Sequence, residues 1–242
     1  MRHYYLAAGF GALALAVWWQ PRAQHDRLAP GAVWAPIRDK VASEGGTGFF
    51  VDRRGHVLTA HHVVAGCKEI DIVGRNGQES ATLEASSPDD DLSLLASERS
   101  FGEPISFDSG DDIAGGTQVT VFSYASEGAG QSAYSGIVLD DRTPRRLAVA
   151  LDAKSGAGGS AVIDRGGRAV GVMQSALAGA AALATSATQR PVRLAANSSV
   201  AREFLRAQGI DQAADRAQAS APIDGLAASE VKVECRTFGS GS

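Results

Sequence analysis

Two adjacent histidines, His61 and His62, follow a short apolar run and are the first residues whose type and position could do chemistry. An imidazole takes up and releases a proton near neutral pH, so a histidine held at a rigid strand end can act as a general base. The pair could instead bind a metal ion or be purely structural. However, no cysteine or further histidine cluster completes a coordination sphere, because His3, His25 and His56 lie elsewhere in the chain. We therefore expect a general base and no bound metal.

The residues around these histidines form a longer motif. They read Gly46-Thr-Gly-Phe-Phe-Val-Asp-Arg-Arg-Gly-His-Val-Leu-Thr-Ala-His-His-Val-Val64. This stretch resembles the histidine motif of the trypsin-like (chymotrypsin-fold) serine peptidases, in which a Gly-x-Gly-Phe strand leads through a hairpin to Leu-Thr-x-x-His-Val. It is most similar to their bacterial HtrA-type branch. The resemblance implies that His62 is the general base of a catalytic triad, and that His61 occupies a position that is usually small or polar.

An acidic residue that could orient this imidazole stands at the start of a later strand. The family supplies it as an aspartate followed directly by an alternating apolar strand, and Asp91 directly precedes the run Leu-Ser-Leu-Leu95. Asp89 and Asp90 also precede that strand, but neither abuts it. The resemblance therefore implies that Asp91 is the orienting acid. A solvated acidic turn is the alternative interpretation of these aspartates.

The third motif of the family is a glycine-rich loop that carries the nucleophilic serine, and here the serine is missing. The chain reads Lys154-Ser-Gly-Ala-Gly-Gly-Ser-Ala-Val-Ile-Asp-Arg-Gly-Gly-Arg-Ala-Val-Gly-Val-Met173. The family pattern places a turn glycine and a strand glycine after the nucleophile, and Gly167 and Gly171 fit these two positions if the nucleophile position is Gly158. Aligning the adjacent glycines with a Ser-Gly-Gly motif would place it at Ala157 instead. An ordinary glycine-rich hairpin is a third interpretation.

The same resemblance implies the rest of the site. Backbone N–H groups of the loop would form an oxyanion hole, where glycine is expected on steric grounds. These residues are Gly156, Ala157 and Gly158. The strand after Gly171 would line the primary specificity pocket, with Met173, Gln174 and Ser175 at its wall. No charge in this set selects a charged substrate residue, so we expect a preference for small or aliphatic residues.

Composition and patterning favour an all-β body. The chain has 242 residues and 28 glycines, with 44% hydrophobic and 6% aromatic residues, and its many short apolar runs are broken by glycine, aspartate and serine. The runs fall into two sets on either side of a glycine-rich break at 110–116. We therefore expect two packed six-stranded β-barrels, at about 43–109 and 117–197. The family resemblance covers 43–197 and implies that the two barrels together form a peptidase domain.

The C-terminal part, residues 198–242, changes character. Apolar residues recur at helical spacing over 198–208, where Ser198 or Ser199 can cap the start of a helix and Gly209 can end it. A linker and a short strand-like piece at 231–235 follow. This part is too short for the PDZ domain that HtrA-type proteins usually append, so we expect none.

The N-terminal part also differs in kind. Residues 4–19 carry no charge, Arg2 precedes them, and Trp18 and Trp19 stand where an interfacial aromatic belt would lie. We expect residues 1–20 to be a signal anchor, with a cleaved signal peptide or a buried helix as alternatives, and residues 21–42 to be a linker. A retained anchor places the body in the bacterial periplasm, held at the inner membrane by residues 4–19. Cleavage would release it.

The two cysteines, Cys67 and Cys235, are an even pair, which in an oxidising compartment predicts a disulfide. Such a bond would tie the C-terminal strand to the first barrel. Two unpaired buried thiols are the alternative.

The three motifs occur in the family's order and together predict a serine endopeptidase-type protein that acts on exported polypeptides without a cofactor. Because the nucleophile is absent, we expect little activity from this sequence. A natural pseudopeptidase, which binds polypeptide in its cleft without cleavage, is the alternative. A formal net charge of -4 and scattered arginines argue against a nucleic-acid partner.

Overall fold

The computed structural model describes residues 42–109, 113–125, 130–140, 145–174, 190–212 and 223–237. All of them belong to one compact unit of the chain, Arg38–Ser242. The apolar segment 4–19 lies outside the described residues. Within the described ranges, no helix is both long and apolar enough to cross a membrane.

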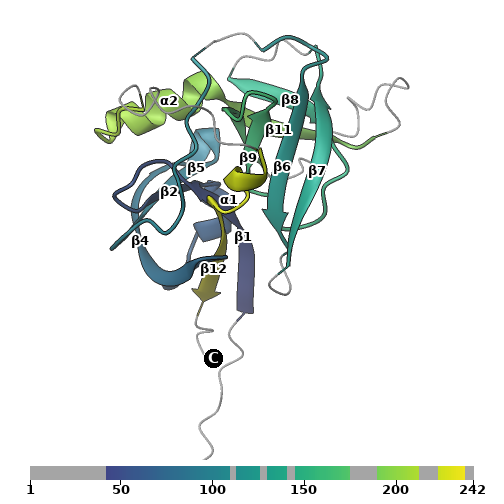
Figure 1. Cartoon of the computed structure of the whole chain (residues 1–242). Helices are drawn as coiled ribbons and strands as arrows, with labels where there is room; N and C mark the ends of the chain where they lie inside the picture. Colours follow the sequence, from purple (N-terminus) through teal and green to yellow (C-terminus); the bar gives the residue numbers. More distant parts are fainter. Residues whose placement is uncertain are drawn as a thin grey trace, which may run out of the picture. The chain divides into compact units, whose positions relative to one another are not determined.

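Six antiparallel strands close the first barrel (Figure 1). They are β1 (Ala42–Phe50), β2 (His56–Thr59), β3 (Glu69–Gly74), β4 (Gly77–Ser87), β5 (Leu92–Ser97) and β12 (Glu230–Thr237). Their order around the barrel is β1-β12-β3-β4-β5-β2. The first five strands are consecutive in the sequence, whereas β12 comes from the C-terminal part and pairs with both β1 and β3.

The sixth strand of the first barrel therefore lies outside the segment 43–109 in which we expected the whole barrel. The side chains of Val231, Val233 and Cys235 alternate into the barrel interior and are buried, which explains the apolar alternation of this piece. The expected disulfide between Cys67 and Cys235 is confirmed, with the two Cα atoms 5.4 Å apart. The disulfide ties β12 to the residues that precede β3.

The second barrel is also closed by six antiparallel strands. They are β6 (Gln118–Tyr124), β7 (Gln131–Val138), β8 (Arg146–Ala150), β9 (Ala161–Asp164), β10 (Ala169–Met173) and β11 (Val192–Asn197). Their order is β10-β11-β8-β7-β6-β9. The predicted all-β fold of two six-stranded barrels is thus confirmed.

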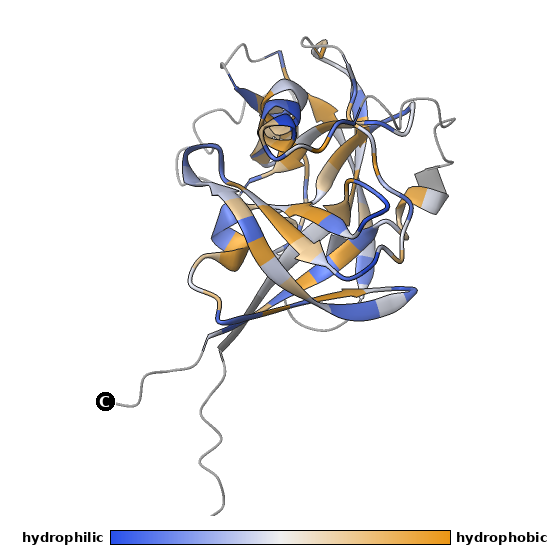
Figure 2. Cartoon of the chain, turned by 90° about the vertical axis from the view of Figure 1, so that its left-hand side faces the viewer, coloured by the Kyte–Doolittle hydropathy of each residue, from blue (hydrophilic) through white to orange (hydrophobic). Residues whose placement is uncertain are grey.

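A shared hydrophobic cluster connects the barrels with α2 (Ser198–Ala207), the longest helix of the described residues. Phe49 of the first barrel, Val172 of the second barrel and Leu205 of the helix all belong to it. Asn197, and not Ser198 or Ser199, caps the helix, because its side-chain oxygen accepts a hydrogen bond from the N–H of Val200 at 3.0 Å. Figure 2 shows apolar residues in orange along the strands and on the helix.

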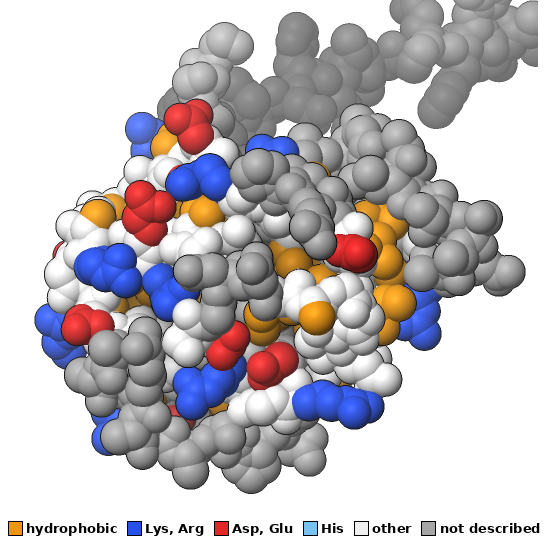
Figure 3. Space-filling view, turned by 90° about the horizontal axis from the view of Figure 1, so that it is seen from above, with side chains coloured by type: hydrophobic (Ala, Val, Ile, Leu, Met, Phe, Trp, Pro, Cys, Tyr) orange, Lys and Arg blue, Asp and Glu red, His pale blue; other side chains and the backbone are white. Residues whose placement is uncertain are grey.

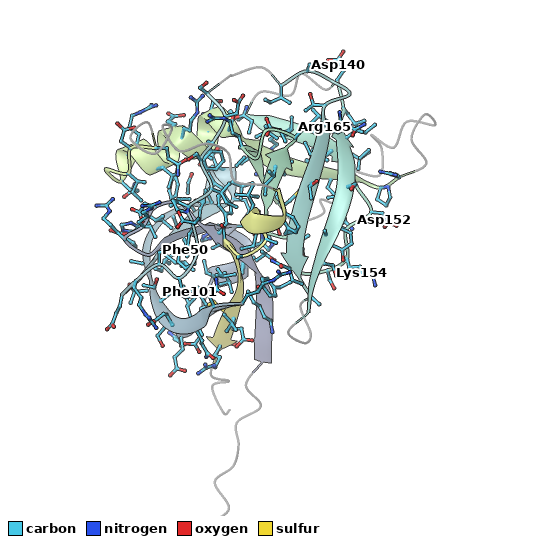
Figure 4. The ribbon with its side chains drawn as sticks, in the orientation of Figure 1. Phe50, Phe101, Asp140, Asp152, Lys154 and Arg165 are labelled. Atoms are coloured by element: carbon cyan, nitrogen blue, oxygen red, sulfur yellow. A yellow bond between two sulfur atoms is a disulfide. The ribbon has the colours of Figure 1, made fainter. Side chains whose placement is uncertain are left out.

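Short elements complete the body. They are α1 (His61–Val64), the 3-10 turn η1 (Pro88–Asp90) and α3 (Ile223–Leu226). The rings of Phe50 and Phe101 pack edge to face inside the first barrel's apolar cluster, with centroids 4.9 Å apart (Figure 4). On the face in Figure 3, the described lysines and arginines are interspersed with aspartates and glutamates.

Candidate active site

His62 lies just after the end of β2, in the single turn of α1. Val63 and Val64 of the same turn are buried in the first barrel, which fixes the turn and directs His62 outward. The imidazole Nδ1 lies 2.8 Å from Oδ2 and 3.1 Å from Oδ1 of Asp91. Because a carboxylate can only accept hydrogen bonds, Nδ1 donates to Asp91, and Nε2 is the ring nitrogen that this contact leaves available to take a proton.

Asp91 is held by its own backbone as well as by the histidine. Its Oδ1 also accepts the backbone N–H of His62 at 2.9 Å, and its carbonyl accepts the N–H of His61 at 3.1 Å. The residue adopts the left-handed conformation, with φ 52° and ψ 47°. This costs a non-glycine residue on the order of 1 kcal/mol or more, so the surrounding structure must hold it. Leu92 and Leu94, buried directly after it, supply one anchor.

The glycine-rich loop brings Gly158 to the imidazole. A Cβ atom on Gly158 would lie 2.5 Å from Nε2 and 2.8 Å from Cε1 of His62. Ala157 points the other way, since its methyl group is buried in the hydrophobic core of the second barrel. Of the two positions considered for the nucleophile, the structure brings Gly158 to the base.

Hydrogen bonds to Thr47 of β1 hold the loop on the first barrel. The Thr47 N–H donates to the carbonyl of Gly158 at 2.9 Å, and its hydroxyl donates to the carbonyl of Gly156 at 2.8 Å. Gly159 has φ +85°, and a Cβ there would collide with the Thr47 carbonyl. Glycine is therefore required at position 159 for the loop to approach β1 so closely.

The backbone donors of the loop divide into two groups. The N–H of Gly159 donates to the carbonyl of Met173 at 2.8 Å. Those of Gly156, Ala157 and Gly158 make no hydrogen bond with any residue that the structure describes. Such unengaged donors beside an imidazole can stabilise a developing negative charge on oxygen.

The residues expected at the specificity pocket are placed only in part. Met173 is buried in the core of the second barrel, and Ser175 lies outside the described residues. Gln174 is 7% exposed, and its side-chain amide donates to the carbonyl of Asp90 at 2.9 Å. Gln174 thus contacts the turn that directly precedes Asp91.

The two other histidines of the described residues, His61 and His56, have other partners. The Nδ1 of His61 lies 3.3 Å from the hydroxyl of Ser86. His56 pairs with Asp52 at 2.6 Å in the turn between β1 and β2. Burial opposes ionisation of Asp52, but hydrogen bonds from His56 and Arg54 outweigh it and lower the pKa of the carboxyl. In the described part of the chain, no three potential ligands gather into a metal site.

Sequence reasoning missed a buried acid next to the loop. Glu230, at the start of β12, is fully buried, and its Oε1 accepts the N–H of Ala161 at 3.0 Å. Its Oε2 has no hydrogen-bond partner among the described residues, and burial raises the pKa of the carboxyl well above its ordinary value. The sequence offers little sign of this burial. Glu230 alternates with the apolar residues Val231 and Val233, and a glutamate at such a position usually faces solvent.

Two β-barrels that bring a histidine–aspartate pair to a glycine-rich loop define the architecture of a trypsin-like peptidase. Residues 46–172, more than half of the chain, match the family model of the trypsin-like peptidase domain. The chain therefore belongs to this family, as its three motifs predicted.

The chain is also similar to a curated protein and to solved protease structures. The uncharacterized protein y4bJ of Sinorhizobium fredii (strain NBRC 101917 / NGR234) is 34% identical over 186 residues, which cover 72% of this chain and 29% of the relative. The chain thus spans less than a third of that relative. The active form of the Rv3671c protease from M. tuberculosis superposes with a TM-score of 0.58 at 22% identity, covering 69% of this chain and 74% of that one. The HtrA-type protease AlgW, solved with a decapeptide, superposes with a TM-score of 0.56 at 20% identity, covering 67% of this chain and 50% of AlgW. At these identities the two structures show a shared fold.

Proposed function

We propose that this chain is a serine endopeptidase-type protein that binds polypeptide beside His62 and, with glycine at position 158, cleaves it little or not at all. One observation carries the proposal: Gly158 faces the Nε2 of His62, while Nδ1 of the same ring is held by Asp91. A base and its orienting acid are assembled where a nucleophile would stand. Without a hydroxyl on that residue, covalent catalysis has no attacking group, and loss of a nucleophile costs on the order of a millionfold in turnover in a related reaction.

The roles of the other groups follow from the chemistry of acyl transfer. With a serine at position 158, His62 would take the hydroxyl proton and deliver it to the leaving amine, and Asp91 would keep the ring oriented. The N–H groups of Gly156 and Gly158 would donate to the oxyanion. The absence of partners for these donors among the described residues supports this role.

The nucleophile position is proposed to be 158 and not 157. Attack requires a hydroxyl within hydrogen-bond reach of Nε2, and the side chain of Ala157 is directed into the second barrel. We expect Gly158→Ser to react covalently with a fluorophosphonate probe and Ala157→Ser to remain unlabelled. Labelling of Ala157→Ser alone would reverse the assignment.

Polypeptide is the proposed ligand, supported by the family and by the decapeptide bound to AlgW. Within the polypeptide, we propose a preference for a small or aliphatic residue at the primary pocket, because none of the residues that the family resemblance assigns to its wall, Met173, Gln174 and Ser175, carries a charge. Phosphonate probes that differ only in this residue test the preference in Gly158→Ser. Faster labelling by a lysine or glutamate probe than by an alanine or valine probe would contradict it.

A natural pseudopeptidase is the second candidate, and the fit at position 158 favours it. A Cβ 2.5 Å from Nε2 of His62 is closer than real side chains approach, so a serine requires the ring or the loop to move. If Gly158→Ser and Ala157→Ser both stay unlabelled while the unchanged protein binds a labelled unfolded polypeptide, this candidate is preferred.

A further inference from the structure

Asp90, the residue before Asp91, is hydrogen-bonded by two residues of the second barrel. It ends η1 in the first barrel, between β4 and β5. Two residues of the second barrel reach it: Arg145, which directly precedes β8, and Gln174, which directly follows β10. The turn that carries Asp91 is therefore held by both barrels.

The contacts engage both ends of Asp90. The guanidinium of Arg145 binds the carboxylate in a two-pronged geometry, with Nε 3.0 Å from Oδ1 and Nη2 2.9 Å from Oδ2. The hydroxyl of Ser87 donates to the same Oδ2 at 3.0 Å. The amide of Gln174 donates to the Asp90 carbonyl at 2.9 Å. The hydrogen bonds from Arg145 hold the pKa of Asp90 below its ordinary value, so the carboxylate stays charged at neutral pH.

Arg145 and Gln174 are themselves held in place by hydrogen bonds to other elements of the second barrel and to α2. The carbonyl of Arg145 accepts the N–H of Asn197, the cap of α2, at 3.1 Å, and its Nη1 lies 3.4 Å from Glu203 of that helix. The backbone N–H of Gln174 donates to the carbonyl of Leu194 in β11 at 2.9 Å. Asp90 is thus tied to rigid elements and not to mobile side chains alone.

We propose that Arg145 and Gln174, acting through Asp90, form a cross-barrel clamp that positions the Asp91 carboxylate against His62. Asp91 sits in a left-handed conformation that has a backbone cost, and the peptide unit joining it to Asp90 is the one whose carbonyl Gln174 holds. Releasing that peptide lets Asp91 relax and withdraw from Nδ1. The clamp residues touch neither substrate nor reacting atoms, so they are positioning residues. Their importance for catalysis rests on the proposed function, whereas their effect on His62 does not.

The test reads the proton on the His62 ring in the full-length protein with its natural Gly158. Nitrogen-15 NMR distinguishes a neutral imidazole protonated at Nδ1 from one protonated at Nε2. In the parent at alkaline pH we expect the Nδ1 form, because Asp91 accepts that proton, whereas free imidazole of histidine favours the Nε2 form. Asp91→Asn can turn an amide N–H toward Nδ1 in place of a carboxylate oxygen, so it marks the signal of the Nε2 form.

Arg145→Leu and Gln174→Leu should each shift His62 toward the Nε2 form, and the double variant should approach Asp91→Asn. Arg145→Lys should recover only part of the parent signal, since an ammonium group cannot bind both carboxylate oxygens. Arg99→Leu is the matched control, because Arg99 pairs with Glu79 at 2.6 Å on the first barrel and its carboxylate partner is buried to a similar degree. Neither Arg99 nor Glu79 makes a hydrogen bond or an ion pair with Asp90 or Asp91 among the described residues.

Parent-like His62 signals in both single variants and the double variant would overturn the proposal, as would an equal shift in Arg99→Leu. If Gln174→Leu fails to fold, Arg145→Leu still decides the outcome, because the Arg145 side chain is 51% exposed and its loss leaves no buried hole. A tautomer shift together with an unlabelled Gly158→Ser would sustain the clamp and refute the proposed function. Labelling of Gly158→Ser without any tautomer shift in the clamp variants would support the proposed function and refute the clamp.

Discussion

Opening the disulfide should lower the free energy of unfolding by between about 2 and 5 kcal/mol. The bond between Cys67 and Cys235 spans 168 residues, and for a closed loop of this length the chain-entropy relation gives roughly 5 kcal/mol, from which native strain subtracts. Because β12 is also hydrogen-bonded to β1 and β3, we expect the opened variant to keep its barrel and to differ in stability. With a urea m-value of about 3 kcal/mol/M, the midpoint should fall by about 1 to 2 M.

The assay is urea unfolding of the oxidised parent, Cys67→Ala, Cys235→Ala and the double variant. Either single substitution opens the same bond, so the three variants should have similar midpoints, apart from small packing differences at each methyl. The reasoning would be refuted if the variants kept the parent midpoint within about 0.3 M. It would also be refuted if the effects of the two single substitutions added up in the double variant, because additive effects indicate two independent interactions and not one shared bond.

Three further predictions follow from the described contacts and the N-terminal segment. Thr47→Val removes a hydroxyl that donates to Gly156 and accepts from the N–H of Tyr124, and it should cost about 1 to 3 kcal/mol in urea unfolding, with an unchanged midpoint as the contrary result. Burial raises the pKa of the Glu230 carboxyl above its ordinary value of 4.5. Between pH 4.5 and the folded-state pKa, the folded state therefore keeps a proton that the unfolded state has released. This carboxyl's contribution to stability is complete below pH 4.5 and is lost as the pH rises toward the folded-state pKa. Glu230→Gln should flatten this fall in thermal unfolding between pH 4 and 8, whereas an equally steep fall would show that another group causes it. We also propose export to the bacterial periplasm through residues 4–19, and fractionation of the tagged protein should place it with the inner membrane, or in the osmotic-shock fluid after cleavage; recovery in the cytosol would contradict export.

The fold was predictable to the extent that its signals are local. Alternating apolar residues and turn chemistry mark strands wherever they occur, and the residues Asp52 to Gly55 form the turn that joins β1 to β2. The same alternation marked 231–235 as a strand but could not name its neighbours. Pairing between β12 and β1 joins residues that lie far apart in the sequence, and no local pattern encodes such a contact.

The site divides in the same way. His62 and Asp91 each lie directly at a strand end inside a recognisable motif, so their types and spacing predicted a pair that the structure brings to 2.8 Å. Arg145 carries no motif and stands 55 residues from Asp90, so its role emerges only from the packed barrels. Gln174 was expected at a pocket wall, and that expectation stays a prediction. A sequence pattern places a residue on a strand without saying which neighbour its side chain reaches, so the hydrogen bond from its amide to the Asp90 carbonyl could not be predicted.

The rate at which a fluorophosphonate probe labels Gly158→Ser tests the central claim most directly, because the probe requires an activated hydroxyl and no knowledge of the substrate. If His62, Asp91 and the loop form a peptidase site that lacks only its nucleophile, Gly158→Ser is labelled, the parent is not, and adding His62→Ala abolishes the label. Labelling that survives His62→Ala, or a correctly folded Gly158→Ser that stays unlabelled, would contradict the account.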